Sequence, residues 1–211
     1  MSDPGTGMRR APVQARSQDS TDRMLDAALI ILDRAGAAGL TISAVSKEAA
    51  VSTGTIYHRF RGRRALLIAA HNRFLARLEE QFITTSAPIW DLAADDDFLL
   101  ELLETFDQTF SQHRNAFRAF MVASHTDADI RERGTESGRR FAAFLIEMLT
   151  QRFSCSHDAA DSAFRIIFAE AVLGTMFTSE EVSASPADRT IRLQHLRAAI
   201  RALLEAGSRP A

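Results

Sequence analysis

The chain has 211 residues, of which 46% are hydrophobic and 25% charged, so it can bury a substantial core and global disorder is excluded. Its formal net charge of −2 conceals an asymmetry, because residues 1–73 carry +5 and the remainder −7. A single cysteine, no apolar stretch of about 18 residues and no apolar signal segment argue against a disulfide framework, a membrane partner and secretion, and we expect a cytoplasmic protein.

A polar segment and one amphipathic helix come first in chain order. Residues 1–18 are predicted to form a flexible basic tail. Its Arg9, Arg10 and Arg16 either reach DNA as an arm in the minor groove or are simply solvated, and the sequence favours neither. Apolar residues at helical spacing predict a helix over 21–35, which two nearby glycines should end.

Two short helices follow, predicted over 42–50 and 53–60, with Thr41 and Ser52 as N-caps. Two short helices joined by a tight turn are typical of a helix-turn-helix. Their inner faces are small and apolar and comprise Val45, Ala49, Ile56 and Phe60. Rotation about the second helix then turns Thr53, Gly54, Tyr57 and His58 toward solvent, with Thr55 at the side, where a recognition helix would meet base edges. Residues 19–65 are therefore a predicted DNA-binding domain.

This segment resembles the DNA-binding region of the TetR/AcrR family of transcriptional regulators. The matching residues are Thr41, Ile42, Val45, Ala49, Val51, Ser52, Gly54, Thr55, Ile56, Tyr57, Phe60, Arg63, Arg64, Leu66 and Leu67. The family often has Lys followed by Glu where this chain has Arg63 and Arg64, which makes the patch more basic. Helix rotation, flanking basic residues and the resemblance together predict DNA contacts at Thr41, Ser43, Ser52, Thr53, Gly54, Thr55, Tyr57, His58, Arg61, Arg63 and Arg64.

Helical spacing continues to the C-terminus, and strand signals are nearly absent. Further helices are predicted over 63–84, 97–113, 115–124, 127–133, 136–153, 157–178 and 188–206. Pro88 and the acidic run Asp95–Asp97 should mark the connection before the helix at 97. We therefore expect an all-α fold of about nine helices, with an N-terminal three-helix helix-turn-helix domain and a helical body over 66–207.

Phenylalanine and methionine are spread over several helices of this body. They are either ordinary core or the lining of a cavity, and the resemblance favours a ligand-binding domain. The predicted ligand-binding residues are Phe106, Phe110, Phe117, Phe120, Met121, His125, Phe141, Phe144, Met148 and Phe168.

The last two long helices have more apolar positions than one face requires. Such helices are buried on two sides, either within one chain or against a second subunit. The family usually dimerises through this pair of helices. The predicted dimer interface comprises Phe164, Ile167, Ala171, Gly174, Leu193, Leu196, Ile200 and Leu203.

These features predict a ligand-responsive transcription regulator. We expect a homodimeric repressor on a pseudo-palindromic double-stranded DNA operator, released by a small, largely apolar molecule of unknown identity. An activator of the same architecture is the alternative. A helical enzyme and a pure interaction module are weaker readings, because the sequence contains no HExxH, P-loop, paired cysteines or nucleotide-binding glycine cluster. No catalytic residues, metal or cofactor are therefore expected.

Overall fold

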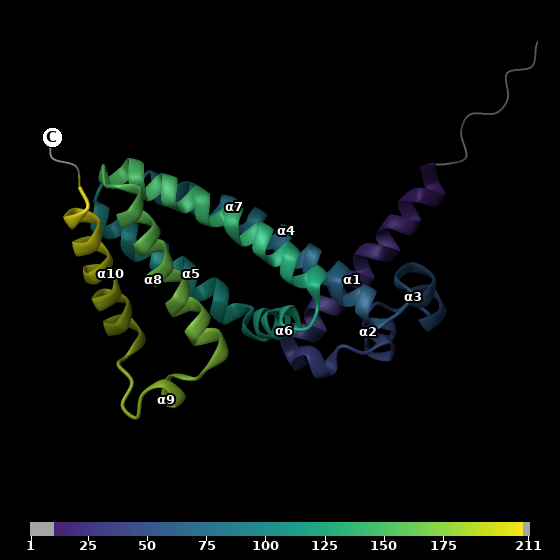
Figure 1. The fold of residues 1–211 in the computed structure, drawn as a ribbon. Helices are drawn as coiled ribbons and strands as arrows, with labels where there is room; N and C mark the ends of the chain where they lie inside the picture. The colour runs from purple at the N-terminus through teal and green to yellow at the C-terminus, as the bar shows by residue number, and fades with distance from the viewer. Residues whose placement is uncertain (1–10, 209–211) are drawn as a thin grey trace, which may run out of the picture. The chain divides into compact units, whose positions relative to one another are not determined.

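The computed structural model describes residues 11–208 and divides the chain into two compact units, Met1–Phe74 and Leu75–Ala211. The described residues are helical, with ten helices and no strand beyond an isolated bridge between Cys155 and Ser208 (Figure 1). The predicted all-α class is therefore confirmed. The boundary between the units falls inside a long helix, later than the predicted boundary at residue 66. None of the helices in the described range is long and apolar enough to cross a membrane.

The first unit contains α1 (Ala11–Gly39), α2 (Ile42–Glu48), α3 (Thr53–Phe60) and the start of α4 (Arg63–Trp90). Its core forms where α1 presents side chains one turn apart to the two short helices and to α4. The fully buried side chains include Met24, Ile31, Leu32, Leu40, Val45, Ile56 and Leu66. Burying each of them contributes roughly 1.5–3 kcal/mol.

Helix α1 differs from the prediction at both ends. It begins at Ala11, so residues 11–18 are helical, and the expectation of a flexible tail is wrong for them. Pro12 lies in the first turn, where the missing backbone N–H costs nothing. At the other end Gly36 has non-helical φ of 61° and ψ of −164°, so the helix is interrupted at the predicted stop and a short second stretch continues to Gly39. Arg9 and Arg10 lie outside the described residues, as does the side chain of Arg16, so the question of an N-terminal arm stays open.

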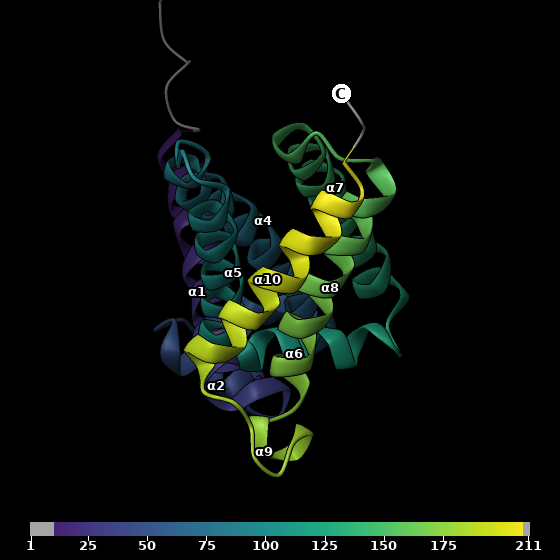
Figure 2. The same ribbon diagram turned by 90° about the vertical axis from the view of Figure 1, so that its left-hand side faces the viewer.

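The second unit contains the rest of α4, α5 (Asp95–Gln112), α6 (Arg114–Ser124), α7 (Ala128–Phe153), α8 (His157–Met176), α9 (Ser179–Val182) and α10 (Arg189–Ala206). Helices α5, α7, α8 and α10 supply its core (Figure 2). Buried core residues include Phe98, Leu102, Leu103, Leu145, Leu149, Ala163, Ile167, Leu193, Ile200 and Leu204.

Three boundaries in this unit were mispredicted. Helix α4 continues through position 88 to Trp90, so Pro88 does not mark the connection. Residues 127–153, predicted as two helices, form the single helix α7, which Asp127 caps. The short α9 was not expected. Its residues carry a capping box made by Thr178 and Glu181, a local signal that was overlooked.

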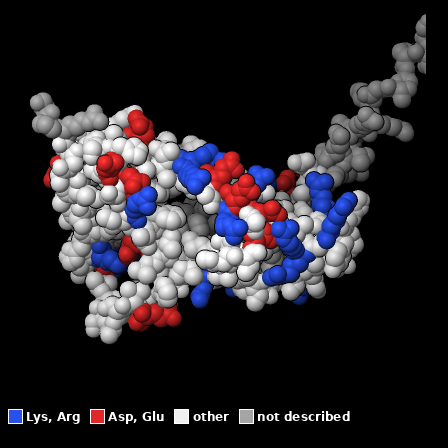
Figure 3. Space-filling model, viewed as in Figure 1, with Lys and Arg blue, Asp and Glu red and all other residues white. Residues whose placement is uncertain are grey.

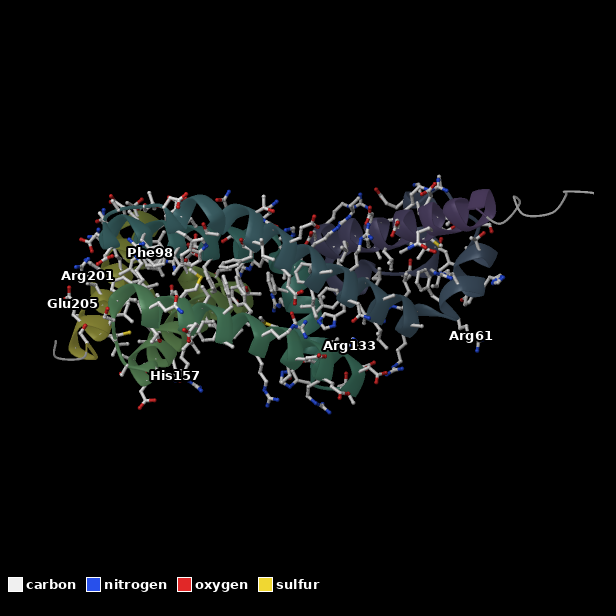
Figure 4. All side chains as sticks on the ribbon, turned by 90° about the horizontal axis from the view of Figure 1, so that it is seen from above. Arg61, Phe98, Arg133, His157, Arg201 and Glu205 are labelled. Carbon is white, nitrogen blue, oxygen red and sulfur yellow. The ribbon has the colours of Figure 1, made fainter. Side chains whose placement is uncertain are left out.

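Ion pairs fasten α10 to its neighbours. At one end Arg201 contacts Asp96 of α5 at 3.1 Å. Arg201 also pairs with Glu205 of its own helix at 2.7 Å (Figure 4). At the other end Arg192 donates to Asp107 of α5 at 2.8 Å and also to Glu170 of α8. These contacts fix which side of α10 lies against α5 and α8, and therefore which side is exposed.

Candidate DNA-binding surface

Helix α3 has one buried stripe and a broad exposed face. Ile56 is fully buried and Phe60 nearly so, which fixes the rotation of the helix. Thr53, Thr55 and His58 are exposed, and the aromatic side chain of Tyr57 is 56% exposed. The predicted rotation of this helix is confirmed. If this face of α3 were buried in a larger core, we would expect long apolar side chains there. The hydroxyl groups and the exposed tyrosine instead suit contact with a polar partner.

The hydroxyl groups at the helix starts also hold the local structure. Ser52 Oγ accepts the backbone N–H of Thr55 at 3.1 Å and lies 2.8 Å from Thr55 Oγ1. Thr41 Oγ1 accepts the N–H of Ala44 at 3.1 Å, so both predicted N-caps are confirmed. Thr53 is exposed at the same end of α3. We therefore expect Thr53 to be more available for contacts with base edges than Ser52 or Thr55.

The turn between α2 and α3 uses a left-handed backbone without glycine. Ala50 has φ of 52°, a conformation that costs an L-residue about 1–2 kcal/mol. Ser46 Oγ offsets part of this cost by donating to the carbonyl of Val51 at 2.6 Å. The turn is thereby closed tightly enough for Val45 and Ile56 to share one core.

The connection from α3 to α4 places two arginines in different roles. Arg61 adopts the left-handed conformation that ends α3, and its side chain points outward (Figure 4). Arg63 opens α4 and donates from Nε to the carbonyl of Leu40 and from a terminal nitrogen to that of Ala37, each at 2.6 Å. Arg63 therefore fastens α4 to the end of α1, a structural role that sequence reasoning did not foresee.

Exposed basic side chains surround α3. Lys47 on α2 and Arg61 at the end of α3 are both exposed, and Figure 3 shows basic side chains on the surface of this unit, with acidic ones among them. Other arginines of the unit are neutralised. Arg73, for example, contacts Asp22 at 2.8 Å and Asp26 at 3.0 Å. The positive charge at α3 is therefore left to face solvent, as binding to a polyanion requires.

All the residues predicted to contact DNA are exposed, and they lie on α2, α3, the start of α4 and the connections before them. Their contacts with DNA remain predictions. Arg59, exposed in the last turn of α3, was not among them. It lies beside the buried stripe on a helical projection, so rotation alone did not assign it to the outer face. Its charge was the available signal, because a charged side chain beside a buried stripe is expected to reach solvent.

His71, in the part of α4 that belongs to the first unit, is buried, unlike His58. Burial lowers its pKa from 6.5 to about 4, because the charged imidazolium is poorly solvated there. At neutral pH His71 is therefore uncharged. It belongs to the packing of the unit and not to its basic surface.

The predicted ligand-binding residues all belong to the second unit, where several form one aromatic cluster. The ring centroids of Phe110 and Phe117 are 4.1 Å apart and nearly parallel. Phe106 lies 5.6 Å from Phe141 and 6.3 Å from Phe110. Elsewhere Phe120 is buried, His125 is exposed at the end of α6, Phe144 and Phe168 are exposed, and Met121 and Met148 are half-buried. Ligand contact at these residues stays a prediction.

The residues of the predicted dimer interface differ in how far they are buried within the second unit. Ile167, Ala171, Leu193 and Ile200 are buried inside the second unit. Side chains buried within one chain have little surface left to bury against another, but no contact with a second subunit is described, so their place in the interface stays a prediction. Phe164, Leu196 and Leu203 are half-buried and Gly174 is exposed, and for them the interface stays a prediction.

Comparison with known proteins relates the N-terminal helices to a family of regulatory proteins. Residues 24–70 match the sequence profile described as bacterial regulatory proteins, tetR family. That range contains most of α1, both short helices and the start of α4. No curated protein matches the sequence.

Solved structures match almost the whole chain. A TetR-family member from Streptomyces coelicolor A3 is 18% identical with a TM-score of 0.60, covering 87% of this chain and 97% of that one. A transcriptional regulator from a Rhodococcus species is 17% identical with a TM-score of 0.68, covering 91% and 100%. The multidrug-binding protein EbrR, complexed with malachite green, is 18% identical with a TM-score of 0.58, covering 87% and 96%. The chain therefore shares its fold with these proteins.

Proposed function

We propose that this chain, whose residues 24–70 belong to the tetR family of bacterial regulatory proteins, is a transcriptional repressor that a small molecule releases from its operator. The observation that carries the proposal is the exposed face of α3, where Thr53, Tyr57 and His58 lie on the same short helix as the exposed Arg59, with the exposed Arg61 at its end. In a helix-turn-helix the N-terminal residues of the second helix enter the major groove. Thr53 and Thr55 would then meet base edges, and Tyr57, Arg59 and Arg61 would meet phosphates.

A homodimer is the second part of the proposal. On α8, Ile166, Leu173 and Phe177 are exposed, and Glu170 of the same helix is hydrogen-bonded to α10, whose Ile191 is also exposed. Exposed apolar side chains gathered on two adjacent helices are typical of a subunit interface. A two-fold axis through this surface would place two α3 helices on one pseudo-palindromic site, with half-sites about 34–36 Å apart.

Ligand control is the third part. The aromatic cluster of the second unit provides a largely apolar environment for a small molecule. EbrR, which has the same fold, was solved with malachite green. A ligand that binds one conformation of the dimer better than another would change DNA affinity by the difference, typically about 5–150-fold.

The proposal is tested by selecting fragments of the source genome that the purified protein retains, and then measuring their affinity by fluorescence anisotropy. We expect a palindromic site bound by one dimer. Thr53→Ala should change the preferred bases, whereas Arg59→Ala should weaken all duplexes alike. Transcription from the selected promoter should rise when the protein is deleted, and a fall would identify an activator. Failure to retain any duplex in dilute salt would refute DNA binding.

A further inference from the structure

The second unit has an open groove between α7 and α8, on the side away from the α10 contacts. Its volume is about 640 Å³, within the range of about 300–1,000 Å³ found for small-molecule sites. Helices α7 and α8 leave the turn that joins them (Figure 1), and residues of both helices line the groove. The lining consists of Arg139, Ala142, Ala143 and Ile146 from α7, and His157, Asp161, Phe164, Arg165, Phe168 and Ala169 from α8.

The apolar part of the groove is shaped for a flat ring. Phe164 and Phe168 stack with centroids 5.8 Å apart and planes 21° from parallel, and Phe168 is 39% exposed. Between Arg139 and Ile146, α7 contributes the small side chains of Ala142 and Ala143 to the lining, which leave space beside the aromatic surface. An aromatic ligand could lie on the exposed phenylalanine without displacing a large side chain.

The aromatic lining continues into the interior of the unit. Phe164 contacts Phe141 at 6.4 Å between centroids, and Phe168 contacts Phe110 at 6.1 Å with the rings nearly perpendicular. A ring bound against Phe164 and Phe168 would therefore press on the cluster that packs α5, α6 and α7 together. This gives the groove a physical route by which occupancy can alter the packing of the unit.

The charged part of the groove favours an anion. Asp161 is the carboxylate of the lining, and Arg165 already binds it at 2.6 Å. Arg139 adds a second guanidinium to the lining, so one positive charge is in excess even with His157 neutral. A cationic ligand would find no uncompensated carboxylate here, whereas a carboxylate could pair with Arg139 in bidentate geometry.

We propose that this groove binds a small aromatic carboxylate, with its ring on Phe164 and Phe168 and its carboxylate on Arg139. The proposal rests on the proposed function, because it names the chemical class of the molecule that controls DNA binding. It also moves the effector site from the aromatic cluster, which contains four of the ten predicted ligand residues, Phe106, Phe110, Phe117 and Phe141, to the groove beside it. Phe168 is the one predicted ligand residue in its lining.

The first experiment measures binding of 2-naphthoate to the full-length dimer by isothermal titration calorimetry, without DNA. Neutral 2-naphthylmethanol and cationic 2-naphthylmethylammonium serve as matched probes with the same ring. We expect 2-naphthoate to bind at least ten-fold more tightly than either. Equal affinity for all three, or no binding of 2-naphthoate, would overturn the proposal.

Two variants locate the site. Arg139→Gln should weaken 2-naphthoate about ten-fold and leave 2-naphthylmethanol unchanged, because only the carboxylate contact is lost. Ala143→Leu should weaken both probes by filling the space beside the aromatic surface. The matched control is Arg133→Gln, an exposed arginine of the same helix outside the groove lining (Figure 4), which should change neither. Wild-type affinity in both groove variants would refute the site.

The remaining measurements separate this inference from the proposed function. Adding 2-naphthoate to the protein–DNA complex should lower duplex affinity at least five-fold in the wild type and have no effect in Arg139→Gln. Binding of 2-naphthoate that leaves duplex affinity unchanged would overturn the effector role.

If duplex is retained but 2-naphthoate is not bound, the groove inference alone fails. If 2-naphthoate binds but no duplex is retained, the DNA-binding proposal fails. If Ala143→Leu converts a dimer to monomers in sedimentation, a second copy occupies the groove and the inference is wrong.

Discussion

Replacing Arg61 with glycine should make the protein more stable and at the same time a weaker DNA binder. Arg61 ends α3 with φ of 52° and ψ of 25°, a conformation that costs a non-glycine residue about 1–2 kcal/mol. Glycine avoids this cost but loses about 0.5–1 kcal/mol through its greater freedom in the unfolded chain. The backbone N–H of residue 61, which donates to the carbonyl of Tyr57 at 2.9 Å, is retained. We therefore expect a net stabilisation of about 0.5–1 kcal/mol.

DNA binding should respond in the opposite direction, because the exposed guanidinium is lost from the basic surface. Each phosphate contact contributes about 0.9 to the slope of log affinity against log salt. With one Arg61 in each subunit, the slope should fall by about 1.8 in the dimer.

Thermal melts and anisotropy titrations between 50 and 200 mM salt, roughly the range over which phosphate contacts are lost, measure both effects. Ala50→Gly is the matched control, because Ala50 has the same φ of 52° in the same unit but no charge to lose. It should be stabilised similarly and keep the wild-type salt slope. If both variants keep that slope, Arg61 does not contact phosphate. If both are destabilised, the backbone argument is wrong.

Three further predictions concern stability and assembly. Burial lowers the pKa of His71 from 6.5 to about 4. As the pH falls, the unfolded chain therefore binds this proton before the folded chain does. The stability present above pH 6.5 should be lost as the pH falls toward 4. The loss should reach about 2 kcal/mol at pH 5 in urea titrations, and an equal loss in a folded His71→Gln variant would count against it. Gly207→Ala should destabilise the chain by about 1–3 kcal/mol, because a Cβ there would lie 2.3 Å from that of Ala159. Gly138→Ala, with nothing within 4 Å, should melt no lower than the wild type; equal melting of the two variants would contradict the packing argument. Leu173→Glu should convert the dimer to monomers in sedimentation, whereas Val122→Glu, also exposed but on α6, should not; an intact Leu173→Glu dimer would refute the α8 interface.

Local interactions made the helix-turn-helix predictable from sequence. Ser52 caps α3 through a neighbour three residues away, and Ile56 and Phe60 lie one turn apart, so the span Thr53–Phe60 and its exposed face follow from residues adjacent in the chain. The predicted helix boundaries were wrong where the local sequence signal was weak or was outweighed by other interactions. Pro88 did not end α4, and residues 11–18 are helical without an apolar stripe.

Long-range packing decided what local spacing could not. Helix α8 has apolar residues around most of its circumference, so its sequence could not tell Ile167, which faces the core, from Leu173, which faces solvent. Nor does spacing reveal that Arg63 reaches carbonyls more than twenty residues earlier in the chain. The sequence by itself therefore determined where most helices lie and which residues share a face of each helix, since helical period and capping depend on near neighbours. Only the tertiary structure decided which of those surfaces meet, because that depends on contacts between residues far apart in the chain, and it alone brought Arg139 and Phe168 to one groove.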